Sequence, residues 1–218
     1  MIKIENCHVD NVARAVYSAR NAMNSWAKSD SDLNTNILGE ADLQLAKKLV
    51  KAGSDHRKFL RMINVTVDIT APMYWWSEAD TYKVGTVRNS CSKMHKLMAK
   101  KFVLDDFSHD HLVSDAVTIL NELIDVLNDA RDAFLEYDSM PDEEKNVMSK
   151  GIDSKKDIWW QIIQLLPSSY NQRSTLQLNY EALRNMYHAR KEHKLDEWRT
   201  FCEWVEGLPY AADLICAR

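Results

Sequence analysis

The clearest pattern in the chain is a run of alternating apolar and polar residues, MINVTVDIT, at positions 62–70. The apolar members of this run are Ile63, Val65, Val67 and Ile69. Such alternation is typical of a strand with one face in the core and the other in water. Pro72 cannot donate a sheet hydrogen bond, so we expect the strand to end there. A second alternating run, QRSTLQLN at 172–179, predicts another strand.

Apolar residues spaced three and four apart predict helices over much of the remaining chain. The predicted helices cover the segments 9–23, 43–50, 112–137, 180–193 and 196–206. Gly53 follows the second of them, where a helix C-terminal cap commonly stands. The polar interval 139–156 is interpreted as a solvated linker or a helix hairpin. We therefore expect an α+β fold with a small sheet embedded among long helices, in a single domain spanning residues 1–218.

Composition narrows the class of protein further. Gly (5) and Pro (4) are scarce among the 218 residues, which favours helices over a fold with many tight turns. The formal net charge of −4 gives no global reason to bind a nucleic-acid polymer, so any basic site must be local. No stretch resembles a membrane span or a signal peptide. Four cysteines without metal-ligand spacing indicate free thiols in a reducing compartment, so we expect a cytoplasmic protein without a metal site.

The segment 75–97, WWSEADTYKVGTVRNSCSKMHKL, is unusually polar and aromatic for a connection after a strand. We expect a short helix, a loop around Gly85, and a further helix. The residues that suggest this last helix are Met94, Leu97 and Met98. Tyr82 and Lys83, beside Gly85 and Thr86, could bind an anion through side chains and loop amides.

The two tryptophans of this segment are adjacent, and neighbouring side chains on a helix diverge by about 100°. We therefore expect only one of them to point into the core. Trp76 is our choice for stacking on a planar ring, and Trp75 for the core. Glu78 could accept a hydrogen bond from a base or a ribose.

Basic residues gather just before the first strand, in GSDHRKFLR at 53–61. The cluster of His56, Arg57, Lys58 and Arg61 could clamp a phosphate, with the alternative that this is a solvated basic turn. Cys91 lies among polar and basic residues, but a buried inert thiol is the favoured interpretation. The basic helix at 187–198 is interpreted as a solvated face. These residues alone point to a small anionic, nucleotide-like ligand and assign no catalytic residue.

The order of these segments resembles the flavin-dependent thymidylate synthases over nearly the whole chain. In that family a strand ending in Ala-Pro leads into an Arg-His-Arg signature, followed by Ser, Asn, Ser and Arg at fixed spacings. Later come Leu-Pro, a strand, and a motif Asn-x-Arg-Ser-Leu at the start of a helix. The matching residues here are Ala71, Pro72, Leu166, Pro167, Asn179, Leu183, Arg190 and Trp198.

Several signature residues are replaced in this chain. Thr81, Tyr82 and Lys83 stand where the family has Arg-His-Arg. The remaining signature positions hold Thr86, Arg88, Cys91 and Lys93. Glu181 stands at an Arg that the family uses to contact deoxyuridylate. The resemblance therefore implies the family's ligand-binding segment, rewritten for another ligand or another chemistry, and we expect no thymidylate synthesis by the ordinary route.

The resemblance also implies a homotetramer with pockets shared between subunits, built from segments 53–61, 75–96 and 170–190. FAD is the cofactor that it implies, and the rewritten form resembles phage and prophage chains, which would place the protein in a host cytoplasm. The chain would then bind a phosphorylated nucleotide-type small molecule, as a sponge for a nucleotide signal in a phage anti-defence role. An active synthase or related pyrimidine-nucleotide methylating enzyme, and a structural phage protein, remain as alternatives.

Residue chemistry and resemblance together give one set of expected ligand-binding residues. They are His56, Arg57, Arg61, Trp76, Glu78, Tyr82, Lys83, Thr86, Arg88, Ser90, Ser92, Lys93, Gln172, Arg173 and Asn179.

Overall fold

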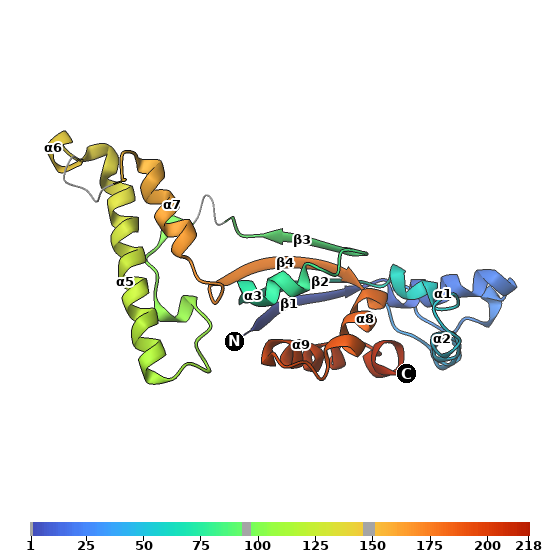
Figure 1. Ribbon diagram of the computed structural model, residues 1–218. Helices are drawn as coiled ribbons and strands as arrows, with labels where there is room; N and C mark the ends of the chain where they lie inside the picture. The colour runs from blue at the N-terminus through green and yellow to red at the C-terminus, as the bar shows by residue number, and fades with distance from the viewer. Residues whose placement is uncertain (1, 93–96, 146–150) are drawn as a thin grey trace. The chain divides into compact units, whose positions relative to one another are not determined.

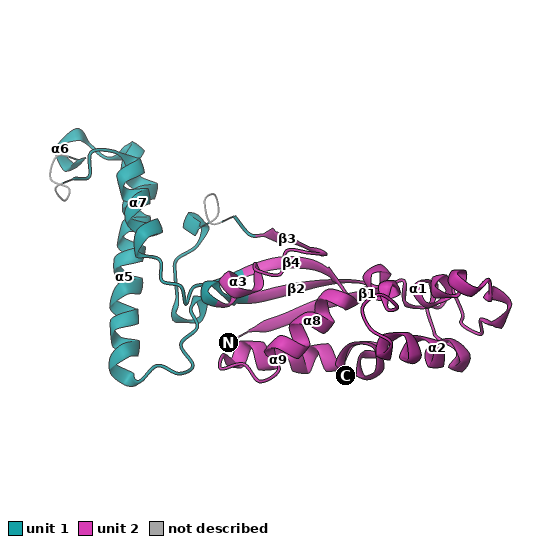
Figure 2. Cartoon of the chain, turned by 45° about the vertical axis from the view of Figure 1, so that its right-hand side comes forward, with its two compact units in different colours: residues 1, 71–74, 91–172 teal, residues 2–70, 75–90, 173–218 magenta. Residues whose placement is uncertain are grey.

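The structure is a computed structural model that describes residues 2–92, 97–145 and 151–218. The chain packs as two compact units (Figure 2). Unit 1 holds residues 71–74 and 91–172, and unit 2 holds residues 2–70, 75–90 and 173–218. Packing into two units does not establish that each unit folds alone, so the single domain stays a prediction.

A four-stranded sheet forms the centre of unit 2 (Figure 1). Its strands are β1 (Lys3–Asp10), β2 (Asn64–Pro72), β3 (Thr86–Ser90) and β4 (Asn171–Asn179). Their order in the sheet is β1-β2-β4-β3, with β1 antiparallel to β2 and β3 antiparallel to β4. The two strands predicted from alternation are confirmed as β2 and β4, and the α+β class is confirmed.

Alternation along the two central strands separates a buried face of the sheet from an exposed one. In β2, Val65, Val67 and Ile69 are fully buried, and in β4 Leu176 and Leu178 lie on the buried face. Figures 1 and 2 both show α8 (Tyr180–Arg190) and α9 (Asp196–Glu206) along one side of the sheet. These two helices begin within one residue of the predicted starts.

The N-terminal prediction is wrong in part, because Val9 belongs to strand β1 and not to a helix. Asn6 has φ of 51°, and the pairing of β1 with β2 is irregular between Glu5 and His8. This β-bulge breaks the period-2 pattern by which a strand is recognised. Asn11, with φ of 70°, then ends the strand and precedes α1 (Val12–Ala19).

The loop expected around Gly85 leads directly into β3, which the sequence analysis missed. A five-residue strand at the sheet edge buries little, so its sequence carries no clear alternation. Of the further helix expected through Met94, Leu97 and Met98, residues 93–96 lie outside the described part of the chain. Residues Leu97–Ala99 form a short 3-10 turn. The remaining helices of unit 2 include α2 (Glu40–Lys51), as predicted, and α3 (Met73–Ala79), which begins in unit 1.

Unit 1 is built on α5 (Ser114–Glu136), which confirms the helix predicted at 112–137. A short α6 (Asp142–Lys145) and α7 (Lys155–Leu165) follow, and α7 packs against α5. Within the interval 139–156, the described residues hold α6 and the start of α7, and residues 146–150 lie outside the described part of the chain. The core of unit 1 consists of Leu97, Phe102, Phe107, Leu120, Ile124, Leu127 and Ile162. Among the described residues, no helix is both long enough and apolar enough to cross a lipid bilayer.

Candidate functional site

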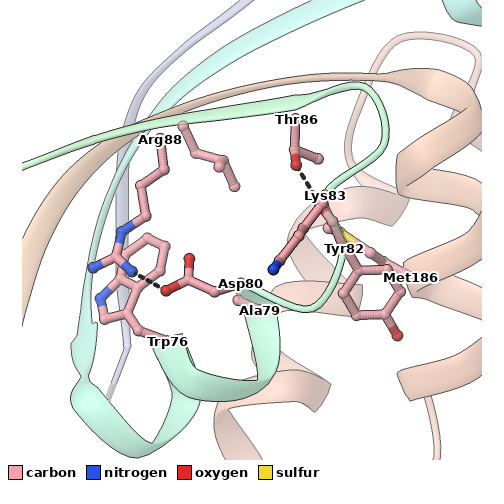
Figure 3. Close-up of a pocket in the computed structure, with 9 residues that line it drawn as sticks. Trp76, Ala79, Asp80, Tyr82, Lys83, Thr86, Arg88 and Met186 are labelled. Carbon is pink, nitrogen blue, oxygen red and sulfur yellow. Dashed lines mark hydrogen bonds and ion pairs between the residues drawn. The ribbon is translucent and has the colours of Figure 1, made fainter.

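A hollow of about 290 Å³ opens in unit 2 beside the segment that follows β2 (Figure 3). The end of α3, the turn into β3, strand β3 itself, and one residue each from β4 and α8 form its wall. The lining residues are Trp76, Ala79, Asp80, Tyr82, Lys83, Thr86, Arg88, Leu176 and Met186. Five of the expected ligand-binding residues therefore meet at one hollow.

Arg88 forms one wall of the hollow. Its guanidinium carbon lies 3.8 Å from the centre of the Trp76 ring, a cation–π contact. Its Nη1 donates to Asp80 Oδ2 at 2.7 Å, and its Nε donates to Ser174 Oγ at 2.9 Å. Asp80 and Ser174 hold the guanidinium in place, so Arg88 presents a fixed cationic plane at the hollow.

Both tryptophans of α3 are buried, at 0% exposure for Trp75 and 2% for Trp76. The expectation that only one of them can be buried is therefore wrong. Trp75 packs against Trp198 and Phe201, with ring centres 4.8 and 5.8 Å away. Trp76 points elsewhere and is covered by Arg88 of the neighbouring strand. Two diverging rings are both buried because different elements cover them.

The turn into β3 sets the position of Lys83. Gly85 has φ of 74°, and a Cβ there would lie 2.5 Å from Asn179 Nδ2, so only glycine suits this position. The Thr86 hydroxyl donates to the Tyr82 carbonyl and closes the turn. Figure 3 shows the Lys83 side chain reaching into the hollow. No carboxylate among the described residues forms an ion pair with Lys83.

Glu78 does not line the hollow and is held in a network of protein groups. Its Oε2 accepts from Arg190 Nη1 at 2.8 Å and from the Trp198 indole nitrogen at 2.9 Å. His193 Nε2 lies 3.4 Å from the same oxygen. Arg190 Nε also donates to the Tyr82 hydroxyl at 2.9 Å. These contacts fix Glu78 and Tyr82, and a ligand contact by Glu78 stays a prediction.

Arg57 and Glu181, neither of which lines the hollow, form a bidentate ion pair. Arg57 Nε and Nη2 donate to the Glu181 carboxylate at 2.9 and 3.0 Å. Glu181 lies in the first turn of α8, where a negative charge is favoured, and Asn179 caps this helix by accepting from the Ala182 amide at 2.9 Å. Burial, with a smaller contribution from Arg57, lowers the pKa of the nearby Arg184. Because Arg57 is paired with Glu181, its charge is already balanced inside the protein.

The remaining expected residues do not line the hollow. His56, Arg61 and Ser90 are exposed, and Ser92 is half-buried. Gln172 donates to the Cys91 carbonyl at 2.8 Å. Arg173 lies on the open face of the sheet and pairs with Asp68 at 2.9 Å. Lys93 lies outside the described residues.

Four lining residues were missed by the sequence analysis: Ala79, Asp80, Leu176 and Met186. Asp80 lies within the polar run already singled out, and its position two residues from both Glu78 and Tyr82 offered only a weak signal. Leu176 and Met186 follow the buried stripes of β4 and α8 and read as ordinary core. Within the described residues, no group of His, Cys, Asp and Glu side chains is arranged to hold a metal ion.

No family model matches this sequence, and no curated protein matches it in sequence. Solved structures match it closely in fold. The flavin-dependent thymidylate synthase ThyX from Helicobacter pylori, complexed with FAD and dUMP, has a TM-score of 0.66 at 16% identity, covering 98% of this chain and 97% of that one. A second structure of that enzyme with FAD and dUMP has a TM-score of 0.66 at 15% identity, covering 99% and 97%.

A third similar structure is the UMP/dUMP methylase PolB from Streptomyces cacaoi, bound with 5-Br dUMP. It has a TM-score of 0.61 at 14% identity, covering 99% of this chain and 95% of that one. Each match covers nearly all of this chain and nearly all of the similar chain. The likeness therefore extends over both units and is not confined to one motif. The chain has the fold of the flavin-dependent thymidylate synthases.

Proposed function

We propose that this protein binds a phosphorylated nucleotide-type small molecule at the hollow lined by Trp76, Lys83 and Arg88. The observation that carries this proposal is the charge of the lining. Asp80 neutralises Arg88, while Lys83 has no ion-pair partner among the described residues and reaches into the hollow. An anion entering there meets one uncompensated cation and one fixed guanidinium, the two groups that most often bind phosphate in proteins.

The ligands of the similar proteins support a nucleotide as the anion. The two thymidylate synthase structures carry dUMP, and the methylase carries 5-Br dUMP. The Arg88–Trp76 stack provides a flat surface that suits a base, because guanidinium planes and aromatic rings stack on π systems. Tyr82, held by Arg190, provides a second ring at the hollow.

FAD does not fit this hollow within a single chain. FAD joins two nucleotides through a pyrophosphate, whereas about 290 Å³ lies at the small end of ligand pockets. Among the described lining residues, Lys83 is the one cation without an ion-pair partner, whereas FAD carries two phosphates. A flavin site would need walls from further copies of the chain, as the resemblance implies for a homotetramer. The proposed function therefore includes no flavin chemistry.

The proposal extends to a binding protein that does not turn its ligand over, made by a phage to hold a nucleotide signal in the host cytoplasm. Its support is the replacement of the Arg-His-Arg signature by Thr81, Tyr82 and Lys83, and of a substrate-contacting Arg by Glu181. A carboxylate at that position cannot donate the hydrogen bonds that an Arg gives to an anionic substrate, and Arg57, which balances its charge, is held in the internal pair.

An active pyrimidine-nucleotide methylating enzyme is the second candidate, and the fold shared with the UMP/dUMP methylase favours it. The colour of the purified protein separates the two candidates, because bound oxidised flavin is yellow. A structural phage protein, the third candidate, would bind no nucleotide at all.

The test is a binding titration of dUMP and UMP against the full chain, with native mass spectrometry to weigh any ligand that co-purifies. Lys83→Ala should raise the Kd about 10-fold, or ~1.4 kcal/mol, because a charge-assisted contact is lost. Lys51→Ala is the matched control, since Lys51 is exposed and lies outside the hollow. Equal affinities of Lys83→Ala and the unmodified protein would place the site elsewhere.

Assembly is tested separately by light scattering at micromolar concentration. The homotetramer that the resemblance implies should appear as a mass four times that of one chain. A monomer would remove any pocket shared between subunits.

A further inference from the structure

A carboxylate lines the hollow in which we place an anionic ligand. It belongs to Asp80, whose Oδ2 accepts from Arg88 Nη1 at 2.7 Å. Within the described part of the chain this is the one side-chain hydrogen bond of Asp80, so its Oδ1 can accept from a further donor. A negative charge disfavours a phosphate beside it, so Asp80 must face another part of a nucleotide.

Asp80 lies beside the flat wall of the hollow. Figure 3 shows Trp76, Arg88 and Asp80 grouped together, with Lys83 reaching in from the opposite side. The hydrogen bond from Arg88 fixes the carboxylate next to the guanidinium that covers Trp76. A base stacked on this guanidinium would have its edge beside Asp80, while the phosphate would lie with Lys83. The carboxylate is therefore placed to read the edge of the base.

The bases differ in what their edges offer to a carboxylate, which only accepts hydrogen bonds. Guanine has two neighbouring donors, its N1–H and its 2-amino group, and both can donate to one carboxylate. Adenine and cytosine each place an amino donor beside a ring nitrogen that accepts. Uracil has one ring N–H between two carbonyl oxygens, and these oxygens repel a carboxylate. Guanine therefore complements Asp80 best and uracil least.

We propose that the ligand of the hollow carries guanine and that Asp80 selects this base. The inference rests on the proposed function, because it names the base of the nucleotide placed there. Selection needs a carboxylate that cannot turn away, and Asp80 is held by Arg88. Ser174 Oγ in turn accepts from Arg88 Nε at 2.9 Å, so the wall that reads the base is fixed from two sides.

One substitution should reverse the hydrogen bonding at this edge. In Asp80→Asn the amide oxygen stays toward Arg88, because a guanidinium only donates. The amide NH2 group then takes the place of Oδ1 and donates into the hollow. It opposes the 2-amino group of guanine, whereas it suits xanthine, which has a carbonyl oxygen at that position.

The test is isothermal titration calorimetry of the full chain with the monophosphates of guanosine, inosine and uridine. The guanosine nucleotide should bind at least about 10-fold more tightly than the uridine nucleotide, the low end of what two well-placed hydrogen bonds to a base contribute. The inosine nucleotide lacks the 2-amino group and should lie between them. Since all three carry the same phosphate and ribose, the differences report on the base alone.

Two variants assign the selectivity to Asp80. Asp80→Asn should weaken binding of the guanosine nucleotide about 10-fold and should bind xanthosine monophosphate more tightly than guanosine monophosphate. Asp125→Asn, at an exposed aspartate of α5 outside the hollow, is the matched control and should keep the order of the unmodified protein. Circular dichroism and light scattering should show both variants folded and unchanged in mass.

Equal affinities for the guanosine and uridine nucleotides would overturn this inference and leave the proposed nucleotide binding standing. Failure of every nucleotide to bind would overturn both. Tighter binding of guanosine than of deoxyguanosine monophosphate, with no dependence on the base, would assign Asp80 to the ribose and overturn it. A changed mass of Asp80→Asn would also do so, because the carboxylate would then serve contacts between copies of the chain.

Discussion

The pair formed by Arg57 and Glu181 allows a sharp test of how the charge reversal in α8 is accommodated. The structure has three nitrogen–oxygen contacts in this pair, at 2.9, 3.0 and 3.2 Å. The two side chains are 17% and 12% exposed, so both charges are largely removed from water. Glu181→Ala therefore leaves the Arg57 guanidinium mostly buried with no opposite charge beside it.

The magnitude follows from this burial. Exposed ion pairs contribute about 0–1 kcal/mol, and breaking a fully buried pair costs about 3–5 kcal/mol. The Arg57–Glu181 pair lies nearer the buried limit, so we expect Glu181→Ala to lower the free energy of unfolding by about 2–3 kcal/mol. Glu192→Ala, at a side chain that is 87% exposed, is the control and should change it by less than about 0.5 kcal/mol.

A double-mutant cycle measured by urea unfolding isolates the interaction itself. Glu181→Ala, Arg57→Ala and the double variant should give a coupling energy of about 1.5–2 kcal/mol. Either single substitution already breaks the charge-assisted hydrogen bonds, so the second substitution cannot remove them again. A coupling below about 0.5 kcal/mol would refute the reasoning, since the two substitutions would then be independent.

The same variants show whether Arg57 also serves a ligand. Glu181→Gln keeps the shape of the side chain and removes its charge, so Arg57 becomes available to an anion. If Arg57 belongs to the ligand site, affinity for dUMP should rise in this variant. An unchanged affinity would assign Arg57 to the internal pair alone.

Three further predictions concern buried and charged groups elsewhere in unit 2. Asp42 is fully buried and accepts from Arg20 Nε at 2.6 Å, so Asp42→Ala should lower the free energy of unfolding by about 3–5 kcal/mol in urea; a loss below about 1 kcal/mol would contradict the assignment of a buried charge pair. Hydrogen bonds from Asn6, Thr175 and Arg173 lower the pKa of Asp68 to about 2, so its stabilising effect is present above the ordinary carboxyl pKa and is lost as pH falls from about 4 to about 2. The stability difference between Asp68→Asn and the unmodified protein should therefore shrink over that interval in acid denaturation, and a constant difference would count against it. Trp76→Ala should lower the free energy of unfolding by about 3 kcal/mol, because a side chain only 2% exposed is removed, and should also remove any fluorescence change on nucleotide binding.

Strands were predictable where one face of the sheet is covered and the other is not. In β2 and β4 that condition holds along the whole strand, so burial imposes alternation on the sequence. β1 contains a bulge at Asn6 that shifts the residues after it to the opposite face, and no single period describes the whole strand. β3 lies at the edge, where Val87 remains 65% exposed and burial imposes little.

The candidate site was predictable to the extent that it is local in sequence. Tyr82, Lys83 and Thr86 stand in one turn, and their chemistry points to an anion whatever the fold. The partners of Arg57 and Glu78 lie more than a hundred residues away in sequence, so composition could not show which charges neutralise each other. Burial of both tryptophans likewise depends on Arg88 and Trp198, which only the folded chain brings to them.

The position of β3 at the edge of the sheet links the hollow to the solubility of the protein. Edge strands with exposed apolar side chains invite pairing with other chains, and charged residues oppose this. Val84 and Val87 are 92% and 65% exposed, and Lys83 and Arg88 flank them in sequence. The two cations that would hold a phosphate are thus also the gatekeepers against edge-to-edge aggregation. A substitution that removes either charge would therefore weaken the proposed phosphate contact and leave the edge strand more prone to pair with other chains.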